Sequence, residues 1–305
     1  MSEFASLRSR RSLLTCGAAL GLAALAACGR GQPASPPASG GANPGGPDEG
    51  PQKGSLQWAA AGKWRAADRS RDAWRHPETT LLFMGLKPKA TVVEFWPGKG
   101  YWSEVVAPYL AANGGTLYAA NFQLGAHPDP AQAEIVQHYK DRFGGDAALY
   151  GNVHETEFGA LSGAVAPAGS ADVVLFMDTL NEWMSAGLAD KAFRDAYAAL
   201  KRGGTLGVFQ HRAALGGIQD PAASNGYVQE AYVRQLAKEA GFAFVGSSEI
   251  NANPKDTRDY PFGVWTLPPT RLSAPRGAPD NLNFNHAKYD LIGESDRMTL
   301  KFRKP

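Results

Sequence analysis

A strand followed by a glycine turn carries the residues best suited to bind a ligand. Residues 91–96 (TVVEFW) are β-branched and aromatic apart from Glu94, and residues 97–100 (PGKG) break the run sharply. Glycines lack side chains, so a ligand can approach the backbone there, and a following helix presents free amide groups to a carboxylate or phosphate. A carboxylate inside an apolar run is costly to bury unless a cation or hydrogen-bond donor meets it. We therefore predict a cofactor-binding turn that consists of Glu94, Pro97, Gly98 and Gly100.

Further polar residues follow other predicted strands, at the edge where an open parallel sheet binds its ligands. Asp178 follows the fourth predicted strand and His211 follows the fifth. Either side chain can take a proton from a nucleophile, and we predict both as catalytic. His154 follows the weaker third strand, and we assign it a cofactor contact. Each assignment has a structural alternative: a helix cap for Asp178, a loop hydrogen bond for His211 and a surface position for His154.

The elements that must position these residues alternate along the chain as far as residue 250. The predicted strands are residues 91–96, 117–120, 147–153, 172–177, 205–210, 242–250 and 298–303. The predicted helices are residues 55–75, 79–84, 101–112, 131–142, 188–200 and 228–240, and residues 251–296 are mostly loop. Strands separated by helices predict a doubly wound, Rossmann-like α/β fold with a mainly parallel sheet. The last strand has no clear crossover helix before it, so we expect it to be antiparallel.

The N-terminus has the pattern of an export signal. Basic residues at positions 8, 10 and 11 precede an apolar run over 13–27, which is short for a membrane span but typical of a signal-peptide core. The run ends in Leu-Ala-Ala-Cys at 25–28, which resembles a bacterial lipobox. We predict a lipoprotein signal peptide at 1–27 and a lipid anchor on Cys28 that holds the exported protein at the membrane, facing the periplasm. An ordinary secretory cleavage site is the alternative, and the paired arginines leave a twin-arginine export route open.

Composition separates a tether from one folded domain. Residues 28–53 are rich in Gly, Pro, Ser and Ala and predict a disordered tether, which leaves residues 54–305 as the domain. The net charge of +2 comes from the leader, because removing residues 1–27 leaves 28 basic and 28 acidic residues. That balance gives no reason to expect a nucleic-acid partner. The six histidines have no metal-ligand spacing, so we predict no metal site.

The order of motifs along residues 74–305 resembles that of class I S-adenosylmethionine-dependent methyltransferases, in particular a bacterial group of predicted methyltransferases that are often exported. The segments that carry the resemblance are RHPETTLLFMGLKPKATVVEFWPGKGYWSEVVAPYL, LYAANF, ALKRGGTLGVFQHRA, AGFAFVGSSEI, YPFGVWTLPPT and DRMTLKFRKP. The resemblance implies seven strands with the last antiparallel, and S-adenosylmethionine as cofactor. Glu94, Gly98 and Gly100 match the family's acidic-x-Gly-x-Gly-x-Gly turn, while Trp96 stands at the first glycine. Asn121 stands where the family has an acidic residue that binds the ribose hydroxyls, so it is the expected ribose contact.

The resemblance implies a methyltransferase that acts on an unknown small-molecule or envelope substrate. S-adenosylmethionine is made in the cytoplasm, whereas Cys28 indicates export. The alternative is therefore a catalytically inactive methyltransferase-like lipoprotein that binds a nucleoside-like ligand or scaffolds an envelope complex, and Trp96 and Asn121 favour it. A third hypothesis, an NAD-dependent oxidoreductase, is disfavoured by Asn121 and by Ser103, where that fingerprint has Gly or Ala.

Overall fold

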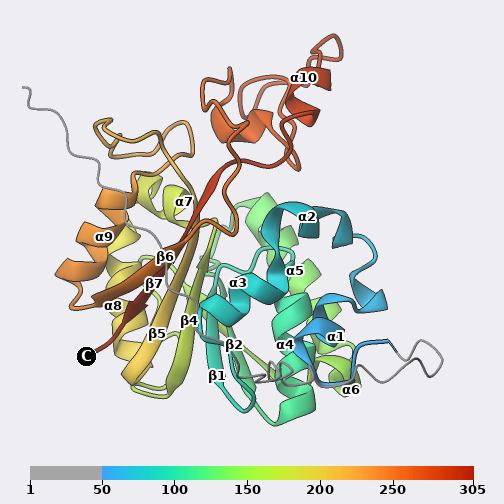
Figure 1. The fold of residues 1–305 in the computed structure, drawn as a ribbon, viewed down its shortest axis with the longest axis vertical. Coiled ribbons are helices and arrows are strands. Elements are labelled where there is room, and N and C mark those ends of the chain that lie inside the picture. The colour runs from blue at the N-terminus through green and yellow to red at the C-terminus, as the bar shows by residue number, and fades with distance from the viewer. Residues whose placement is uncertain (1–49) are drawn as a thin grey trace, which may run out of the picture. The chain divides into compact units, whose positions relative to one another are not determined.

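A seven-stranded sheet organises the computed structural model, which describes residues 50–305. The strands are β1 (Thr91–Phe95), β2 (Thr116–Phe122), β3 (Val153–Phe158), β4 (Ala171–Met177), β5 (Leu200–His211), β6 (Ala243–Ser248) and β7 (Arg297–Arg303). Their order across the sheet is β3-β2-β1-β4-β5-β7-β6, and only β7 runs antiparallel to its neighbours (Figure 1). The predicted fold class is therefore confirmed. The predicted signal peptide, Cys28 and the tether up to residue 49 lie outside the described residues.

Helices cover both faces of the sheet, as a doubly wound fold requires. The helices that follow β1, β2, β4 and β5 are α4 (Ser103–Asn113), α5 (Pro130–Gly144), α7 (Leu180–Ser185), α8 (Ala189–Ala199) and α9 (Glu230–Glu239). One hydrophobic cluster packs α7, α8 and α9 against the sheet, and a second packs α4 and α5 together with α3 (Pro77–Phe83) against the other face. Both clusters lie wholly within residues 48–305, which form one compact unit. No helix within the described range is long and apolar enough to span a membrane.

The predicted third strand at 147–153 is wrong. Residues Ala147–Tyr150 form a single helical turn, α6, because the Asp146 carboxylate accepts a hydrogen bond from the amide of Leu149 and caps it. Gly151, with a φ of 70°, ends that turn, and β3 begins only at Val153. His154 consequently lies near the amino end of β3 instead of following a strand.

The predicted helix at 55–75 is broken into short pieces by tertiary contacts. The pieces are α1 (Leu56–Ala60), η1 (Lys63–Arg65), η2 (Arg69–Arg71) and α2 (Asp72–Arg75). The Arg65 side chain is fully buried and donates two hydrogen bonds to the Asp72 carboxylate, at 2.8 and 2.7 Å. The Trp64 indole nitrogen donates to the Glu104 carbonyl oxygen at 2.9 Å. These contacts fold the segment back over the end of the sheet, which a straight helix could not do.

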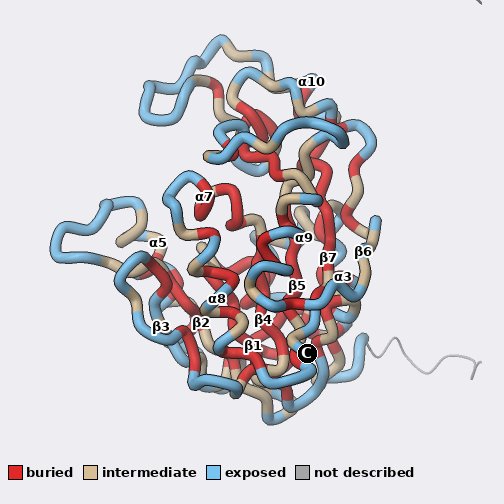
Figure 2. The backbone as a smooth tube through the Cα atoms, turned by 90° about the vertical axis from the view of Figure 1, so that its left-hand side faces the viewer, coloured by how far each residue is buried: buried red, intermediate tan, exposed pale blue. Residues whose placement is uncertain are grey.

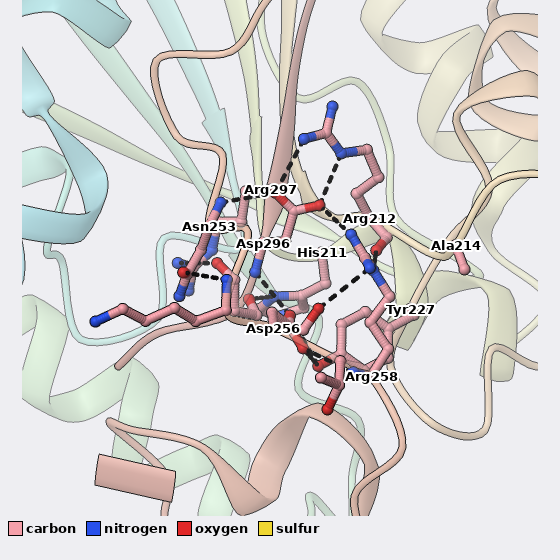
Figure 3. Close-up of polar contacts among 12 residues, drawn as sticks. His211, Arg212, Ala214, Tyr227, Asn253, Asp256, Arg258, Asp296 and Arg297 are labelled. Carbon is pink, nitrogen blue, oxygen red and sulfur yellow. Dashed lines mark hydrogen bonds and ion pairs between the residues drawn. The ribbon is translucent and has the colours of Figure 1, made fainter. Parts of the chain in front are cut away.

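The segment 251–296 is mostly loop, as predicted, with short helical turns at η3 (Gly263–Thr266) and α10 (Ala287–Asp290). Buried carboxylates fasten its two ends to the end of β5 (Figure 3). Asp296 accepts hydrogen bonds from the Arg212 guanidinium at 2.9 Å and from the Asn253 amide at 2.8 Å. Asp256 accepts from the Tyr227 hydroxyl at 3.0 Å. The segment is thereby held beyond the carboxyl ends of the strands, at the top of Figure 1.

Candidate functional site

A cavity of 310 Å³ lies at the carboxyl ends of β1, β4 and β5 and at the start of β7. We call it the inner cavity. Its floor is made by the glycine turn and by the residues that end the strands, and its roof by residues 68–75 and 264–270. Glu94, Pro97, Gly98, Asp178 and His211 all line it, so the fold brings most of the predicted site residues together. Its size falls within the range of small-molecule sites.

Glu94 is the buried acid of this cavity, with 1% of its surface exposed. One carboxyl oxygen, Oε2, accepts a hydrogen bond from the Ser103 hydroxyl at 2.6 Å, and Ser103 in turn contacts the Tyr139 hydroxyl at 2.8 Å. The other oxygen, Oε1, has no partner within the described chain. Burial raises the pKa of Glu94 to about 7.

Two more buried polar atoms at the cavity wall have no hydrogen-bond partner within residues 50–305: the indole nitrogen of Trp102 and the hydroxyl of Thr179. Trp102 is 3% exposed and Thr179 is 8% exposed. A buried polar group without a partner costs about 1–3 kcal/mol. Together with Glu94, these residues form a wall of the cavity that holds buried donors and acceptors without a partner in the described chain.

The two glycines of the turn have different roles. Gly98 has a φ of 60°, and a Cβ atom added there would meet nothing within 4 Å, so the backbone is open to a ligand. Gly100 has a φ of 92°, and a Cβ atom there would lie 2.2 Å from the ring of Phe143. Gly100 does not line the cavity. Helix α5 occupies the space that its missing side chain leaves, and its role as a cofactor contact stays a prediction.

A buried ionic network closes the far side of the cavity. Arg297 donates to both oxygens of Asp178, at 3.1 and 2.9 Å, and its Nη2 atom lies 2.7 Å from the Glu294 carboxylate. Arg75 also donates to Glu294, at 2.7 Å. Burial opposes the charge on Glu294, but its arginine neighbours prevail and lower its pKa to about 2. Asp178 therefore orients Arg297 and does not cap helix α7, whose Leu180 amide donates to Gln210 instead.

His211 is held beside this network. Its Nδ1 atom lies 2.6 Å from the Ser295 hydroxyl and 3.6 Å from Asp178. Burial is the main reason that its pKa is lowered to about 4, although Asp178 acts in the opposite direction. The imidazole is therefore neutral at pH 7.

The formal charge around the cavity is positive. Its charged lining consists of the cations Arg71, Arg75, Lys99 and Arg297 and the carboxylates Glu94, Asp68 and Asp178. With Glu94 protonated, four cations face two carboxylates, and Glu294 behind them removes one further charge, so one positive charge is left, which ionisation of Glu94 cancels. A small ligand with a carboxylate or phosphate group suits this balance.

Trp96 separates the inner cavity from a second hollow. Its backbone has a φ of 43°, which costs about 1–2 kcal/mol for a residue with a side chain. Its indole nitrogen donates to the Phe158 carbonyl at 2.9 Å, and its ring packs 4.5 Å from that of Phe122. The hollow beyond it, which we call the outer hollow, is lined by Trp96, Phe122, Gln132, Glu182 and Arg276, among others. Trp96 thus fills space at the ends of β1 and β2.

The two remaining predicted cofactor contacts do not reach the inner cavity. Asn121 is 3% exposed, and its amide donates to the Glu155 carboxylate at 3.2 Å. His154 stacks on Tyr118, with 4.9 Å between the ring centres, near the start of β3. His154 is exposed, which agrees with the alternative that it is a surface residue. It lies in β3 and does not follow it, because β3 begins later than predicted.

Several functional candidates were not singled out from the sequence, namely Arg71, Arg75, Lys99, Trp102, Thr179 and Arg297. Thr179 directly follows Asp178, and Trp102 lies in the turn, so position could have indicated them. Arg297 is only three residues after Glu294, whereas Arg75 comes from the other end of the domain and reaches Glu294 only through folding. Within the described range, no cluster of three or more His, Cys, Asp or Glu side chains could hold a metal ion.

Comparison with known proteins gives structural but no sequence matches. No protein-family model and no curated protein matches the chain. Among solved structures, the [4+2]-cyclase SpnF is similar at a TM-score of 0.54 and 17% identity, over 77% of this chain and 82% of that one. A SAM-dependent methyltransferase from Aquifex aeolicus has a TM-score of 0.45 and 18% identity, over 62% and 92%. A TehB-like SAM-dependent methyltransferase from Corynebacterium glutamicum has a TM-score of 0.44 and 11% identity, over 79% and 97%.

The chain has the Rossmann-like fold of class I methyltransferases. The strand order and the single antiparallel strand carry that conclusion. At such low identity the similarity describes the fold alone, and SpnF is a cyclase, so the function has to be argued from the site.

The inner cavity suits one end of S-adenosylmethionine better than the other. A ligand that carries a carboxylate and an ammonium group finds Arg71 and Arg75 for the first and the free oxygen of Glu94 for the second. Gly98 leaves the backbone open beside them. The expected ribose contact at Asn121 does not fit, because its amide is bonded to Glu155 and the Trp96 ring fills the space at the end of β2.

Proposed function

We propose that the chain is an S-adenosylmethionine-dependent methyltransferase of the cell envelope, anchored through Cys28 and acting on an anionic small molecule or envelope component. The observation that carries the proposal is the wall of buried, unpartnered polar atoms beside Gly98, in a sheet with the class I methyltransferase strand order. The anchor rests on the lipobox-like end of the leader.

The residues of the inner cavity have distinct parts in this proposal. Arg71 and Arg75 bind the carboxylate of the cofactor, and Glu94 accepts a hydrogen bond from its ammonium group. Bound S-adenosylmethionine supplies an electrophilic methyl group. His211, neutral at pH 7, accepts a hydrogen bond from a hydroxyl or amine nucleophile and orients it, since its lowered pKa makes it a weak base. Lys99, which lines the cavity and forms no ion pair within the described chain, remains for the charge of the substrate.

Calorimetry with S-adenosylmethionine on residues 48–305 tests the proposal, since this unit contains both hydrophobic clusters. Gly98→Val fills the open backbone and should weaken binding at least tenfold. Gly169→Val is the matched control, because Gly169 has a φ of 63° and equally open surroundings but lies away from the cavity. Equal affinity in wild type and Gly98→Val, or no heat of binding in wild type, would contradict the cofactor assignment.

A labelling experiment tests the anchor separately. Cells that express the full chain should incorporate radiolabelled palmitate, and Cys28→Ser should abolish the label and release the protein from membranes. Unlabelled wild-type protein would exclude the lipoprotein assignment without affecting the cofactor proposal.

A second function is favoured by Trp96: a catalytically inactive, methyltransferase-like lipoprotein that binds a different anionic ligand in the inner cavity or scaffolds an envelope complex. The indole fills space between the two hollows and is fixed there by its bond to Phe158. Trp96→Gly restores the glycine of the family's turn. If binding of S-adenosylmethionine is absent in wild type and appears in Trp96→Gly, the inactive protein is the correct assignment.

A further inference from the structure

A second, cationic cleft lies at the opposite edge of the sheet, where strands β1, β4 and β5 begin. It has a volume of 420 Å³ and is lined by Lys87, Lys89, Lys201 and Arg202, with Asp172 as its single carboxylate. The turns at this lower edge are mostly exposed (Figure 2). The cleft therefore presents a concentrated positive charge to its surroundings.

Most of that charge is not used within the domain. Lys201 pairs with Asp172 at 2.7 Å, and the other oxygen of Asp172 accepts a hydrogen bond from the Thr91 amide at 2.8 Å. Lys87, Lys89 and Arg202 form no ion pair with any residue of the described range. A charged cleft that the fold leaves uncompensated is suited to an anionic partner.

The chain enters the domain at this same edge. Asn113, the last residue of α4, donates to the Gly54 carbonyl at 2.8 Å. Three residues further on, β2 begins at Thr116, whose amide donates to the Ala90 carbonyl at 2.9 Å. Ala90 lines the cationic cleft. Gly54, close to the first described residue, thus lies at the same edge as the cleft.

We propose that this edge is a membrane-facing surface, in which Lys87, Lys89 and Arg202 bind the phosphate groups of anionic lipids. Basic residues next to an anionic bilayer contribute roughly 1 kcal/mol each, and they act within about 10 Å of the surface. The inner cavity, at the opposite ends of the strands, then faces away from the bilayer. The orientation uses the proposed anchor at Cys28, but the binding surface lies entirely within residues 54–305.

A competing surface lies at the other edge. Leu215 and Ile218, in the loop after β5, are 90% and 99% exposed. If these apolar tips entered a bilayer instead, the inner cavity would face the lipid. The two surfaces can be distinguished by experiment. Membrane binding through the cationic cleft requires anionic lipid and is weakened by salt, whereas binding through Leu215 and Ile218 depends on neither.

Co-sedimentation of residues 48–305 with lipid vesicles tests the proposal and does not involve Cys28, so failure of the anchor and failure of this surface are distinguishable. Vesicles of phosphatidylcholine with about a quarter phosphatidylglycerol should bind the protein, and salt of about 0.5 M should release it. The triple variant Lys87→Gln, Lys89→Gln, Arg202→Gln should bind roughly 100-fold more weakly, at about fivefold per charge. The control Lys140→Gln, Lys255→Gln, Lys288→Gln removes the same charge elsewhere and should bind like wild type.

Four outcomes would overturn the proposal. The first is equal binding to phosphatidylcholine alone, and the second is wild-type affinity in the triple variant. The third is loss of binding in Leu215→Ser, Ile218→Ser, which would assign the membrane face to the other edge. Inorganic phosphate at millimolar concentration should not release the protein, and complete release would identify a free-phosphate site in place of a membrane surface.

Discussion

The inner cavity and the outer hollow share one wall, Trp96, but differ in almost every other respect. The inner cavity has buried charges that are paired with one another and buried polar atoms that have no partner within the described chain. The outer hollow has an exposed ion pair, Arg276 with Glu182, and the aromatic rings of Trp96 and Phe122, which pack against each other. The difference shows that buried polar groups without a partner in the described chain are concentrated on the Gly98 side of Trp96.

The largest expected difference between the two hollows is in how much their ion pairs contribute to the free energy of unfolding. Arg297→Met removes both hydrogen bonds to the buried Asp178 and leaves Glu294 with Arg71 and Arg75 only, and it should lower the free energy of unfolding by about 3–5 kcal/mol. Arg276→Met breaks a pair whose side chains are 54% and 38% exposed and should cost about 0–1 kcal/mol. Urea unfolding of both variants measures this, and equal losses would remove the contrast.

A pH titration of stability probes the unpartnered acid. The folded-state pKa of Glu94 is raised from 4.5 to about 7, so the stability that it contributes is present below pH 4.5 and is lost as the pH rises through 7. His211, lowered from 6.5 to about 4, acts in the opposite direction and destabilises the fold as the pH falls from 6.5. Between pH 4.5 and pH 7, the free energy of unfolding of Glu94→Gln should therefore rise by about 3 kcal/mol relative to that of wild type. Parallel curves for the two proteins would show that Glu94 titrates normally.

The two glycines of the turn allow a comparison at closer range. Gly100→Ala forces a methyl group against the Phe143 ring and should destabilise the domain by about 2–3 kcal/mol. Gly98→Ala meets no neighbour and should cost only the strain of its positive φ, about 1 kcal/mol. Thermal unfolding compares the stabilities of the two variants. If Gly98→Ala were the less stable one, the open side of the turn would be at Gly100 instead.

The smallest expected effect on ligand affinity comes from Asn121. At a ribose site, an aspartate here would tighten binding of S-adenosylmethionine roughly fivefold through charge-assisted bonds. Because Asn121 is bonded to Glu155 and does not line the inner cavity, we instead expect Asn121→Asp to leave the affinity unchanged. It should lower stability by about 1 kcal/mol by placing two carboxylates together. Calorimetry and urea unfolding of this variant distinguish the two expectations.

The sequence by itself determined where most of the strands and helices lie and at which edge of the sheet most site residues are found. Periodicity located the strands on either side of each crossover helix, and the carboxyl ends of parallel strands share one edge, so Glu94, Gly98, Asp178 and His211 could be placed together. It failed at β3, because a carboxylate cap on Asp146 makes a helical turn from residues that also suit a strand.

Only the tertiary structure decided how the two sides of the turn differ. Whether a glycine is open to ligand or filled by a neighbour depends on where α5 places Phe143, which no local pattern contains. The direction of the Trp96 ring, the partner of Asn121 and the meeting of Arg75 with Arg297 at Glu294 likewise depend on contacts between distant segments. Burial sets the pKa of Glu94 and His211 for the same reason, because the number of water molecules a group loses is a property of the packed domain.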